Sequence, residues 1–357
     1  MATLKEAFEI ISSLPSIWDK HRHLDPDYLT SIKMGASLAD EFGYRGVLLH
    51  YNLHAMEPWP VVSVILESTR FLTPLIAAQP TNLPPHTAAR LCMTAAALFK
   101  RRVDLNLIIG AKPEEQKSVG DTLPHDEKYA RLEEYGRVIR EILVAAEPYK
   151  HSGKWYTYDN FVLSPPMHQA LLPRVFVAGA SPAALAVARR VADIVVTHPQ
   201  DVEAFKENIA DVLSQSERKV SLSVRVGIIA RSHRDEARAV ALERFPQTRR
   251  GEVVTKMKTK AESNWLRALA QESLQADGDQ FSSVFWLGAY RSGSAYCPYL
   301  VGSYDEVGGV LSQYHALGAR VLLVDGPDTR AEFAHHDAVF IRPTVPTADI
   351  KAVRAQS

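Results

Sequence analysis

A short turn in the middle of the chain has the residue types that hold a phosphate group. Residues 174–178 (RVFVA) are apolar and β-branched, which is typical of a strand buried in a parallel sheet. Gly179 and Ala180 follow and let a ligand approach the backbone, Ser181 is a good N-cap, and Pro182 fits the first position of a helix. Such a helix start directs free N–H groups and a positive dipole end at one point, so the turn is a candidate phosphate site. The same residues are also compatible with an ordinary capped turn between a strand and a helix.

Two further residue types in apolar surroundings are candidates for chemistry. Arg225 lies in an alternating strand pattern, residues 221–230 (SLSVRVGIIA), where a buried charge is costly unless it is paired or faces an anion. His50 ends another predicted strand, and an imidazole can serve as acid or base near neutral pH. His21, His23 and His54 accompany it, and this group could also bind a metal or simply be exposed on surface loops.

Composition limits the partners of the protein. The 357 residues include 41 Lys plus Arg and 41 Asp plus Glu, so no overall basic field attracts nucleic acid or an anionic membrane. Cys92 and Cys297 have no ligand spacing, which argues against a disulfide framework or a metal site. No apolar stretch approaches the roughly 20 residues of a membrane span, and no signal segment is evident. We therefore expect a cytoplasmic protein with a small-molecule partner.

The alternation of strand and helix patterns predicts the fold. Strands are predicted over residues 8–14, 45–51, 72–78, 103–109, 174–178, 193–197, 221–230 and 319–325. Helices are predicted over residues 26–42, 59–67, 84–99, 131–146, 183–191, 202–213, 233–245 and 304–317, and a hairpin over 153–163. Eight strands separated by helical sequence indicate an α/β fold, a (β/α)8 TIM-type barrel with its active groups on the loops after the strands. An open doubly wound sheet is the alternative, but no GxGxxG follows the first strand.

Residues 246–303 are too long for a simple connection. A polar, basic part is followed by an aromatic and glycine-rich part, and long insertions in compact domains are often active-site lids. We predict one domain over residues 1–357 with this lid inserted before the last helix and strand. Lys256, Lys258 and Lys260 within it are interpreted as a solvated helix face rather than a binding patch.

An ordered series of motifs resembles the bacterial luciferase-like flavin monooxygenases, most closely the alkanesulfonate monooxygenase branch. The motifs are GYRGVLL, EPW, LIAAQPTNLPPHTAAR, LNLIIGAKPEE, HDEKYARLEEY, GKWYTYDNFVL, FVAGAS, ADIVVT and LVGSYDEVGGVLSQYHALGARVLLVDG. The resemblance implies a TIM-type barrel, usually a homodimer or homotetramer, that binds FMNH2 supplied by a separate NAD(P)H:flavin reductase. It implies that O2 forms a C4a-(hydro)peroxyflavin, which transfers one oxygen atom to a small organic substrate. That chemistry needs a dry pocket, which a lid could provide.

The resemblance also assigns residues to the cofactor. Gly179, Ala180 and Ser181 match the FMN phosphate site, in agreement with the argument from the helix start. Ala78 and Asn106 match positions near the flavin ring, although a strand asparagine can also be a satisfied amide of the barrel core. His125 and Tyr129 match a His-x-x-x-Tyr motif beside the flavin or its phosphate, and a capping histidine with a packed tyrosine is the alternative.

Three residues are predicted to be catalytic. Arg225 and Arg291 match two arginines that the sulfonate enzymes place near the substrate, and Arg291 would close over the site with the lid. An exposed lid arginine is the alternative for Arg291. His50 is the candidate for a replacement acid or base.

Four polar positions of the sulfonate branch are missing. Ile17, next to the matched Pro15, replaces a histidine, and Ala55 replaces a cysteine. Gly227 replaces a second histidine and Pro327 stands near the place of a tyrosine. These changes predict a wider and drier pocket and make desulfonation of alkanesulfonates doubtful.

The sequence leaves other functions open. An F420-dependent oxidoreductase on the same barrel and a flavin-binding protein without turnover are both compatible with the motifs. A phosphosugar isomerase or aldolase would need a base such as a lysine at a strand end, and no strand-end lysine is found.

Overall fold

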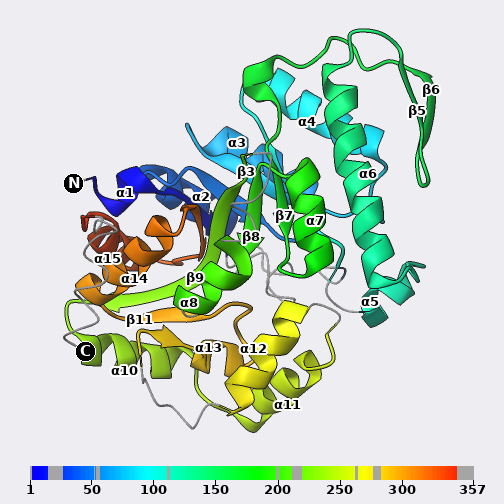
Figure 1. Cartoon of the computed structure of the whole chain (residues 1–357). Helices are drawn as coiled ribbons and strands as arrows, with labels where there is room; N and C mark the ends of the chain where they lie inside the picture. The colour runs from blue at the N-terminus through cyan, green and yellow to red at the C-terminus, as the bar shows by residue number, and fades with distance from the viewer. Residues whose placement is uncertain are drawn as a thin grey trace.

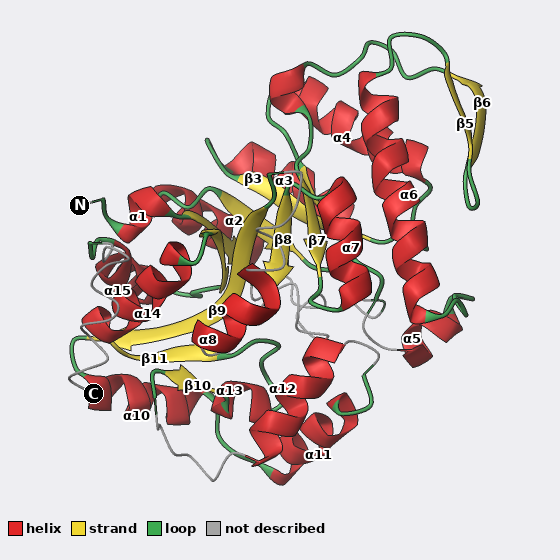
Figure 2. Cartoon of the chain, in the orientation of Figure 1, coloured by secondary structure: helices red, strands yellow, loops and turns green. Residues whose placement is uncertain are grey.

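The computed structural model describes residues 2–14, 27–51, 53, 57–110, 113–197, 200, 202–210, 219–261, 264–275 and 283–343. Its centre is a closed ring of parallel strands surrounded by helices (Figures 1 and 2). In ring order the strands are β1 (Glu9–Ser13), β2 (Gly46–Leu49), β3 (Thr73–Ala78), β4 (Asp104–Leu107), β7 (Val175–Ala178), β8 (Ile194–Thr197), β9 (Ser221–Arg231) and β12 (Ala319–Asp325). Since β9 pairs with both β8 and β12, and β12 pairs with β1, the ring closes and the predicted (β/α)8 barrel is confirmed.

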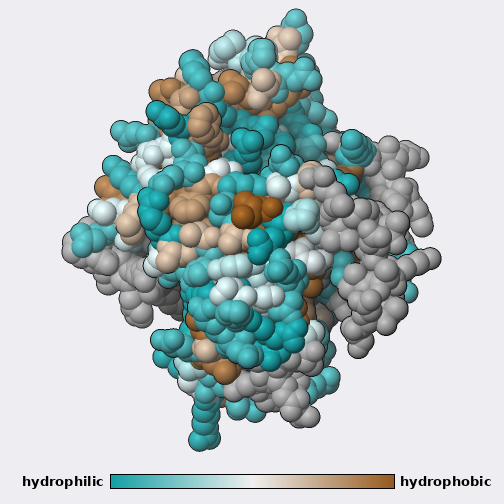
Figure 3. Space-filling view, turned by 90° about the vertical axis from the view of Figure 1, so that its left-hand side faces the viewer, coloured by the Kyte–Doolittle hydropathy of each residue, from teal (hydrophilic) through white to brown (hydrophobic). Residues whose placement is uncertain are grey.

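Helices cover the outside of the barrel and bury its apolar outer face. They are α1 (Leu4–Ala7), α2 (Tyr28–Glu41), α3 (Pro58–Ser68), α4 (Pro85–Phe99), α5 (Pro113–Ser118), α6 (His125–Val144), α7 (Pro182–Val191), α8 (Val202–Phe205), α10 (Arg234–Arg244), α14 (Tyr304–Ala316) and α15 (Arg330–Phe340), with a 3-10 turn over Gln169–Leu171. The face seen in Figure 3 is mainly hydrophilic, with hydrophobic residues in small separate groups. Within the described residues, we find no helix with the length and apolar character of a membrane span.

Several elements extend beyond their predicted bounds. Helix α6 starts at His125, six residues before the predicted start, because its buried stripe already includes Lys128 and Tyr129. The hairpin strands β5 (Tyr149–Ser152) and β6 (Thr157–Phe161) begin before the predicted hairpin. Within the helix predicted over residues 202–213, α8 is followed by a π-helix over Lys206–Ala210. The unpredicted α15 buries Phe333, His336 and Phe340 against the barrel.

The insertion is partly built into the sheet. It contains α11 (Arg249–Lys258), α12 (Asn264–Gln275), β10 (Phe285–Trp286), α13 (Gly288–Arg291) and β11 (Tyr299–Ser303). The end of the long strand β9 pairs with β11, and β10 pairs antiparallel with β11. A second small core, which includes Phe245, Trp286 and Tyr299, holds this unit against α10. A role of the insertion as a lid stays a prediction.

A cluster of charged side chains closes the amino-terminal end of the barrel. Arg174 donates from Nη1 to Glu9 Oε2 at 2.6 Å and from Nε to Asp104 Oδ2 at 2.9 Å. Above this group, inward-facing apolar side chains fill the interior: Ile11, Leu75, Phe176, Ile194 and Val321. Among the described residues, this packing closes the barrel interior at the amino-terminal end, which leaves the carboxyl ends of the strands for a ligand.

One buried histidine makes the stability of the fold depend on pH. His336 lies between the Tyr44 hydroxyl and the Ile228 carbonyl, each 3.1 Å from a ring nitrogen, and burial lowers its pKa to about 4. The unfolded chain, with a histidine pKa of about 6.5, binds more protons below that pH, so stability falls as the pH falls from about 6.5 towards 4. We expect the shifted pKa of His336 to lower the free energy of unfolding by about 2 kcal/mol when the pH falls from 7.5 to 5.

Urea unfolding of the wild type and of His336→Gln at both pH values tests this expectation. The difference in unfolding free energy between the two pH values should be about 2 kcal/mol smaller in the variant. Equal pH dependence of the two proteins would show that His336 is not the group responsible.

Candidate active site

A cavity of about 1050 Å3 opens at the carboxyl ends of the strands. Its floor is formed by side chains that point into the barrel, among them Leu48, Ala77, Val196 and Leu323. Its walls come from the loops after the strands, from α5 and the start of α6, and from α11 with the turn after it. The position is the one where barrel enzymes carry their active sites, and the volume is at the upper end of the range for ligand pockets.

The predicted phosphate turn lies on the wall of this cavity. Gly179 has φ +145°, and a Cβ at this residue would lie 2.5 Å from Tyr129 Oη and 2.7 Å from Ala184 Cβ. Only glycine suits both the conformation and the space. Ser181 Oγ accepts a hydrogen bond from Ala184 N–H at 3.2 Å and caps α7 as predicted.

The turn before α7 has two backbone donors without an acceptor among the described residues. Gly179 and Ala180 line the cavity, whereas Ser181 is not among the described lining residues. Gly179 N–H donates to Val196 O at 3.2 Å, and the N–H groups of Ala180 and Ser181 donate to no acceptor in the described part of the chain. Two amides at a helix start are thus available to an anion.

His125 and Tyr129 stand beside this turn. His125 is the first residue of α6, and its ring packs edge-on against that of Tyr129 at 5.1 Å. Tyr129 Oη donates to Ala178 O at 3.2 Å, and burial raises the pKa of the Tyr129 phenol. Both residues line the cavity, so the structure brings the predicted His-x-x-x-Tyr motif next to the phosphate turn.

Asn106 points into the cavity from β4, and Ala78 does not. The Asn106 side chain is 6% exposed, and its Oδ1 has no hydrogen-bond partner among the described residues. In the neighbouring strand Ala77 pairs with Asn106 and lines the cavity, while Ala78 packs in the outer core. Because alternate strand residues face opposite sides, the structure does not place Ala78 in the cavity: the inward residue is Ala77, one position earlier.

Arg225 is paired with a carboxylate at the edge of the cavity. Arg225 Nη2 lies 3.2 Å from Asp325 Oδ1, and Tyr299 Oη lies 3.5 Å from Asp325 Oδ2. Burial by itself lowers the pKa of Arg225, but the carboxylate of Asp325 and the nearby Cys297 raise it overall, so the guanidinium stays charged. Burial, followed by Asp325, raises the pKa of the Cys297 thiol well above its usual value.

Sequence reasoning did not assign Asp325, Tyr299 or Cys297 to the site. For Asp325 a signal existed, because it is the last residue of the eighth predicted strand, where barrel enzymes place their polar groups. Tyr299 and Cys297 lie in the insertion, and nothing in their local pattern indicated their neighbours.

His50 lines the cavity and is 6% exposed. Burial, and then the positive charge of Arg225, lower the pKa of His50 well below its usual value. The imidazole is therefore neutral at physiological pH, and a neutral ring offers one nitrogen as a hydrogen-bond acceptor. The other members of the predicted histidine group, His21, His23 and His54, lie outside the described residues.

Arg291 and the three lysines of the insertion lie differently with respect to the cavity. Arg291 donates from Nε to Gln247 Oε1 at 2.8 Å and is not among the described residues that line the cavity. The lysines at 256, 258 and 260 do line it, and Lys256 and Lys260 are exposed, so this solvated segment also forms part of the cavity wall. Lys258 donates to Ala295 O at 3.1 Å and lies 4.1 Å from the centre of the Tyr290 ring.

The predicted widening of the pocket does not occur at Gly227. A Cβ at Gly227 would lie 2.3 Å from three atoms of the Tyr299 ring, so the space left by the missing side chain is filled by that ring. Pro327 is buried, and Pro15, Ile17 and Ala55 lie outside the described residues.

Gly227→Ala is therefore expected to lower the free energy of unfolding by about 2 kcal/mol, because the rigid Tyr299 ring must move. Gly309→Ala is the control: this glycine lies within α14, a Cβ there would meet no atom within 4 Å, and the change should stabilise by roughly 0.5–1 kcal/mol. Denaturant unfolding measures both. Equal effects of the two substitutions would contradict the packing of Tyr299 on Gly227.

Comparison with known proteins defines the class. The family model of the luciferase-like monooxygenases matches residues 11–320, so the chain belongs to this family, and the expected class of flavin-dependent monooxygenase is confirmed. The chain is 33% identical over 335 residues to the 4-(gamma-L-glutamylamino)butanoyl-[BtrI acyl-carrier protein] monooxygenase BtrO of Niallia circulans. This match covers 94% of the chain and 96% of the relative.

Solved structures show the same fold at lower identity. The EDTA monooxygenase EmoA of Chelativorans sp. BNC1 has a TM-score of 0.74 at 16% identity, covering 96% of both chains. The oxygenating constituent of 3,6-diketocamphane monooxygenase from Pseudomonas putida, solved with FMN, has a TM-score of 0.69 at 15% identity and covers 95% and 99% of the two chains. An F420-dependent secondary alcohol dehydrogenase has a TM-score of 0.67 at 16% identity, with the same coverage.

Proposed function

We propose that the protein is a two-component monooxygenase that uses O2 and reduced FMN, with the FMNH2 supplied by a separate NAD(P)H:flavin reductase. The observation that carries this proposal is that the phosphate turn at Gly179 opens into the same cavity as Asn106 and Arg225. A phosphate monoester and a planar ring system can thus be bound at two places in one cavity.

The described residues fit reduced FMN. The free amides of Ala180 and Ser181 would hold the phosphate, with the bare Cα of Gly179 allowing close approach. Asn106 Oδ1, a buried acceptor without a partner among the described residues, would take a ring N–H. When bound, reduced FMN supplies the electrons that activate O2 for transfer of one oxygen atom.

The remaining groups prepare the cavity for that chemistry. Its apolar floor of Leu48, Val196 and Leu323 excludes water. His50, kept neutral, can accept a hydrogen bond, and the charged Arg225 donates hydrogen bonds from a fixed position. Because Asp325 offsets the charge of Arg225, this arginine is not a free cation for a sulfonate at the cavity edge, which supports a substrate other than an alkanesulfonate.

We propose further that the substrate is an acyl group attached to an acyl-carrier protein. The support is the identity of 33% over nearly the full length to BtrO, whose name specifies such a substrate. The oxygen source and the cofactor can be tested without that substrate.

Parallel anaerobic titrations with FMNH2 and with reduced F420 test the cofactor. We expect binding of FMNH2 in the micromolar range and much weaker binding of reduced F420. The complex with FMNH2 should then consume O2 when aerated buffer is added. Tighter binding of reduced F420 would favour an F420-dependent oxidoreductase, and stable flavin binding without O2 consumption would favour a protein without turnover.

A further inference from the structure

We propose that the surface formed by α11 and the turn after it, residues 249–260, beside the cavity mouth, is the docking site for an acidic acyl-carrier protein. This inference rests on the proposed function and names the partner that delivers the substrate. The carrier would bind on α11 and insert its acyl-loaded arm into the cavity alongside that helix.

The charge of this segment differs from that of the whole chain. The protein has equal numbers of cationic and anionic residues, but residues 249–260 (RRGEVVTKMKTK) carry five cations and one anion, Glu252. Arg249, Arg250, Lys256 and Lys260 are exposed, and none of the four forms an ion pair with a carboxylate in the described ranges. Four exposed charges without intramolecular partners are available to an anionic surface.

The cations share a helix face with exposed apolar side chains. Arg249, Val253 and Lys256 follow one another at spacings of three or four residues, so they lie along one side of α11, and Lys260 lies in the turn that follows the helix. Val253 is 47% exposed, and Met257, four residues later, is 68% exposed. A face that combines cations with Val and Met matches a partner helix that combines carboxylates with apolar residues.

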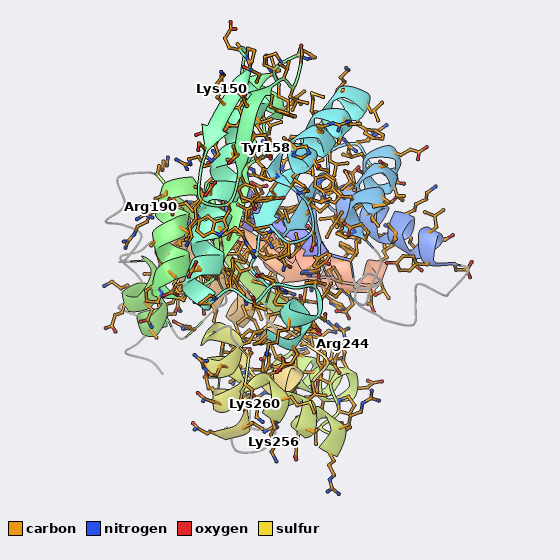
Figure 4. The ribbon with its side chains drawn as sticks, turned by 90° about the vertical axis from the view of Figure 1, so that its right-hand side faces the viewer. Lys150, Tyr158, Arg190, Arg244, Lys256 and Lys260 are labelled. Carbon is orange, nitrogen blue, oxygen red and sulfur yellow. The ribbon has the colours of Figure 1, made fainter. Side chains whose placement is uncertain are left out.

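The same face is continuous with the cavity. Val253, Lys256, Met257 and Lys260 all line the cavity as well as being exposed. A partner bound on α11 therefore lies at the entrance of the cavity. From there its acyl-loaded arm can extend directly to the cavity floor. Figure 4 shows Lys256 and Lys260 together at one end of the molecule, with Lys150 and Arg190 elsewhere.

A second wall of the cavity carries the opposite charge. Glu114 and Glu115 at the start of α5 also line the cavity, so the lining contributed by α5 is acidic. An acidic carrier is attracted by α11 and repelled by α5, which places it on one side of the entrance.

Binding of the holo BtrI acyl-carrier protein, immobilised as the probe, tests the proposal by surface plasmon resonance. We expect Lys256→Glu/Lys260→Glu to weaken binding by about tenfold or more, and added salt to weaken wild-type binding. Arg249→Glu/Arg250→Glu should also weaken it, and this variant keeps α11 folded because acidic residues suit a first helical turn. Lys33→Glu/Lys150→Glu, with the same change in net charge on exposed residues elsewhere, should bind like the wild type.

The proposal is overturned if wild-type protein shows no binding to the carrier, or if the control pair weakens binding as much as the α11 pairs do. A separate measurement tests the proposed function independently of the docking surface. FMNH2 binding and O2 consumption by the wild type are measured without carrier protein. Normal flavin activity together with charge-independent carrier binding would remove the docking surface and leave the monooxygenase proposal intact.

Discussion

Ser181→Asp is expected to lower the affinity for FMNH2 by about a hundredfold and leave the fold intact. Aspartate is as good an N-cap as serine, so the bond to Ala184 N–H and the start of α7 are preserved. The new carboxylate would stand beside the amides proposed to hold the phosphate. A like charge about 4 Å away costs about 4 kcal/mol at an effective dielectric constant of 20, and a hundredfold loss needs only about 2.7 kcal/mol.

Thr248→Asp provides the matched control. Thr248 caps α11 in the same way, with its hydroxyl accepting from Gly251 N–H at 3.1 Å, and it does not line the cavity. Anaerobic calorimetry should give wild-type FMNH2 affinity for this variant. Unchanged affinity in Ser181→Asp, with both variants fully folded by circular dichroism, would rule out the turn as the phosphate site.

Arg225→Leu is expected to lower the free energy of unfolding by about 3 kcal/mol, because it leaves the Asp325 carboxylate without its charged partner in a mostly buried site. The same change removes the proposed donor at the cavity edge, so the rate of substrate oxygenation should fall by about two orders of magnitude. Denaturant unfolding and steady-state kinetics measure the two effects.

A double-mutant cycle separates them. Arg225→Leu/Asp325→Leu removes both charges, so its stability should recover by at least 1–2 kcal/mol relative to Arg225→Leu, whereas its activity should not. If the loss of stability in the double variant equals the sum of the losses in the two single variants, the Arg225–Asp325 pair is not coupled. Recovery of activity along with stability would show that Arg225 acts only on the fold.

The fold was predictable because its signals are local. Buried parallel strands read as continuous apolar runs, and all eight predicted runs became the strands of the barrel. The phosphate turn was predictable for the same reason, since a helix cap and a glycine with positive φ are determined by a few adjacent residues.

The rest of the site depends on contacts between distant segments. A continuous apolar run does not reveal which alternate residue faces inward, so Ala78 was assigned in place of Ala77. The Tyr299 ring on Gly227 and the Asp325 partner of Arg225 arise from strands far apart in the chain. The lysines of α11 have an ordinary solvated pattern, and only the position of the helix shows that they line the cavity.

A comparison of FMNH2 with reduced riboflavin, which lacks only the phosphate, tests the central claim most directly. Anaerobic titration of the wild-type protein should give at least about a hundredfold tighter binding of FMNH2. In Ser181→Asp this preference should disappear. Equal affinities of the wild type for the two reduced flavins would contradict a phosphate site at Gly179, Ala180 and Ser181.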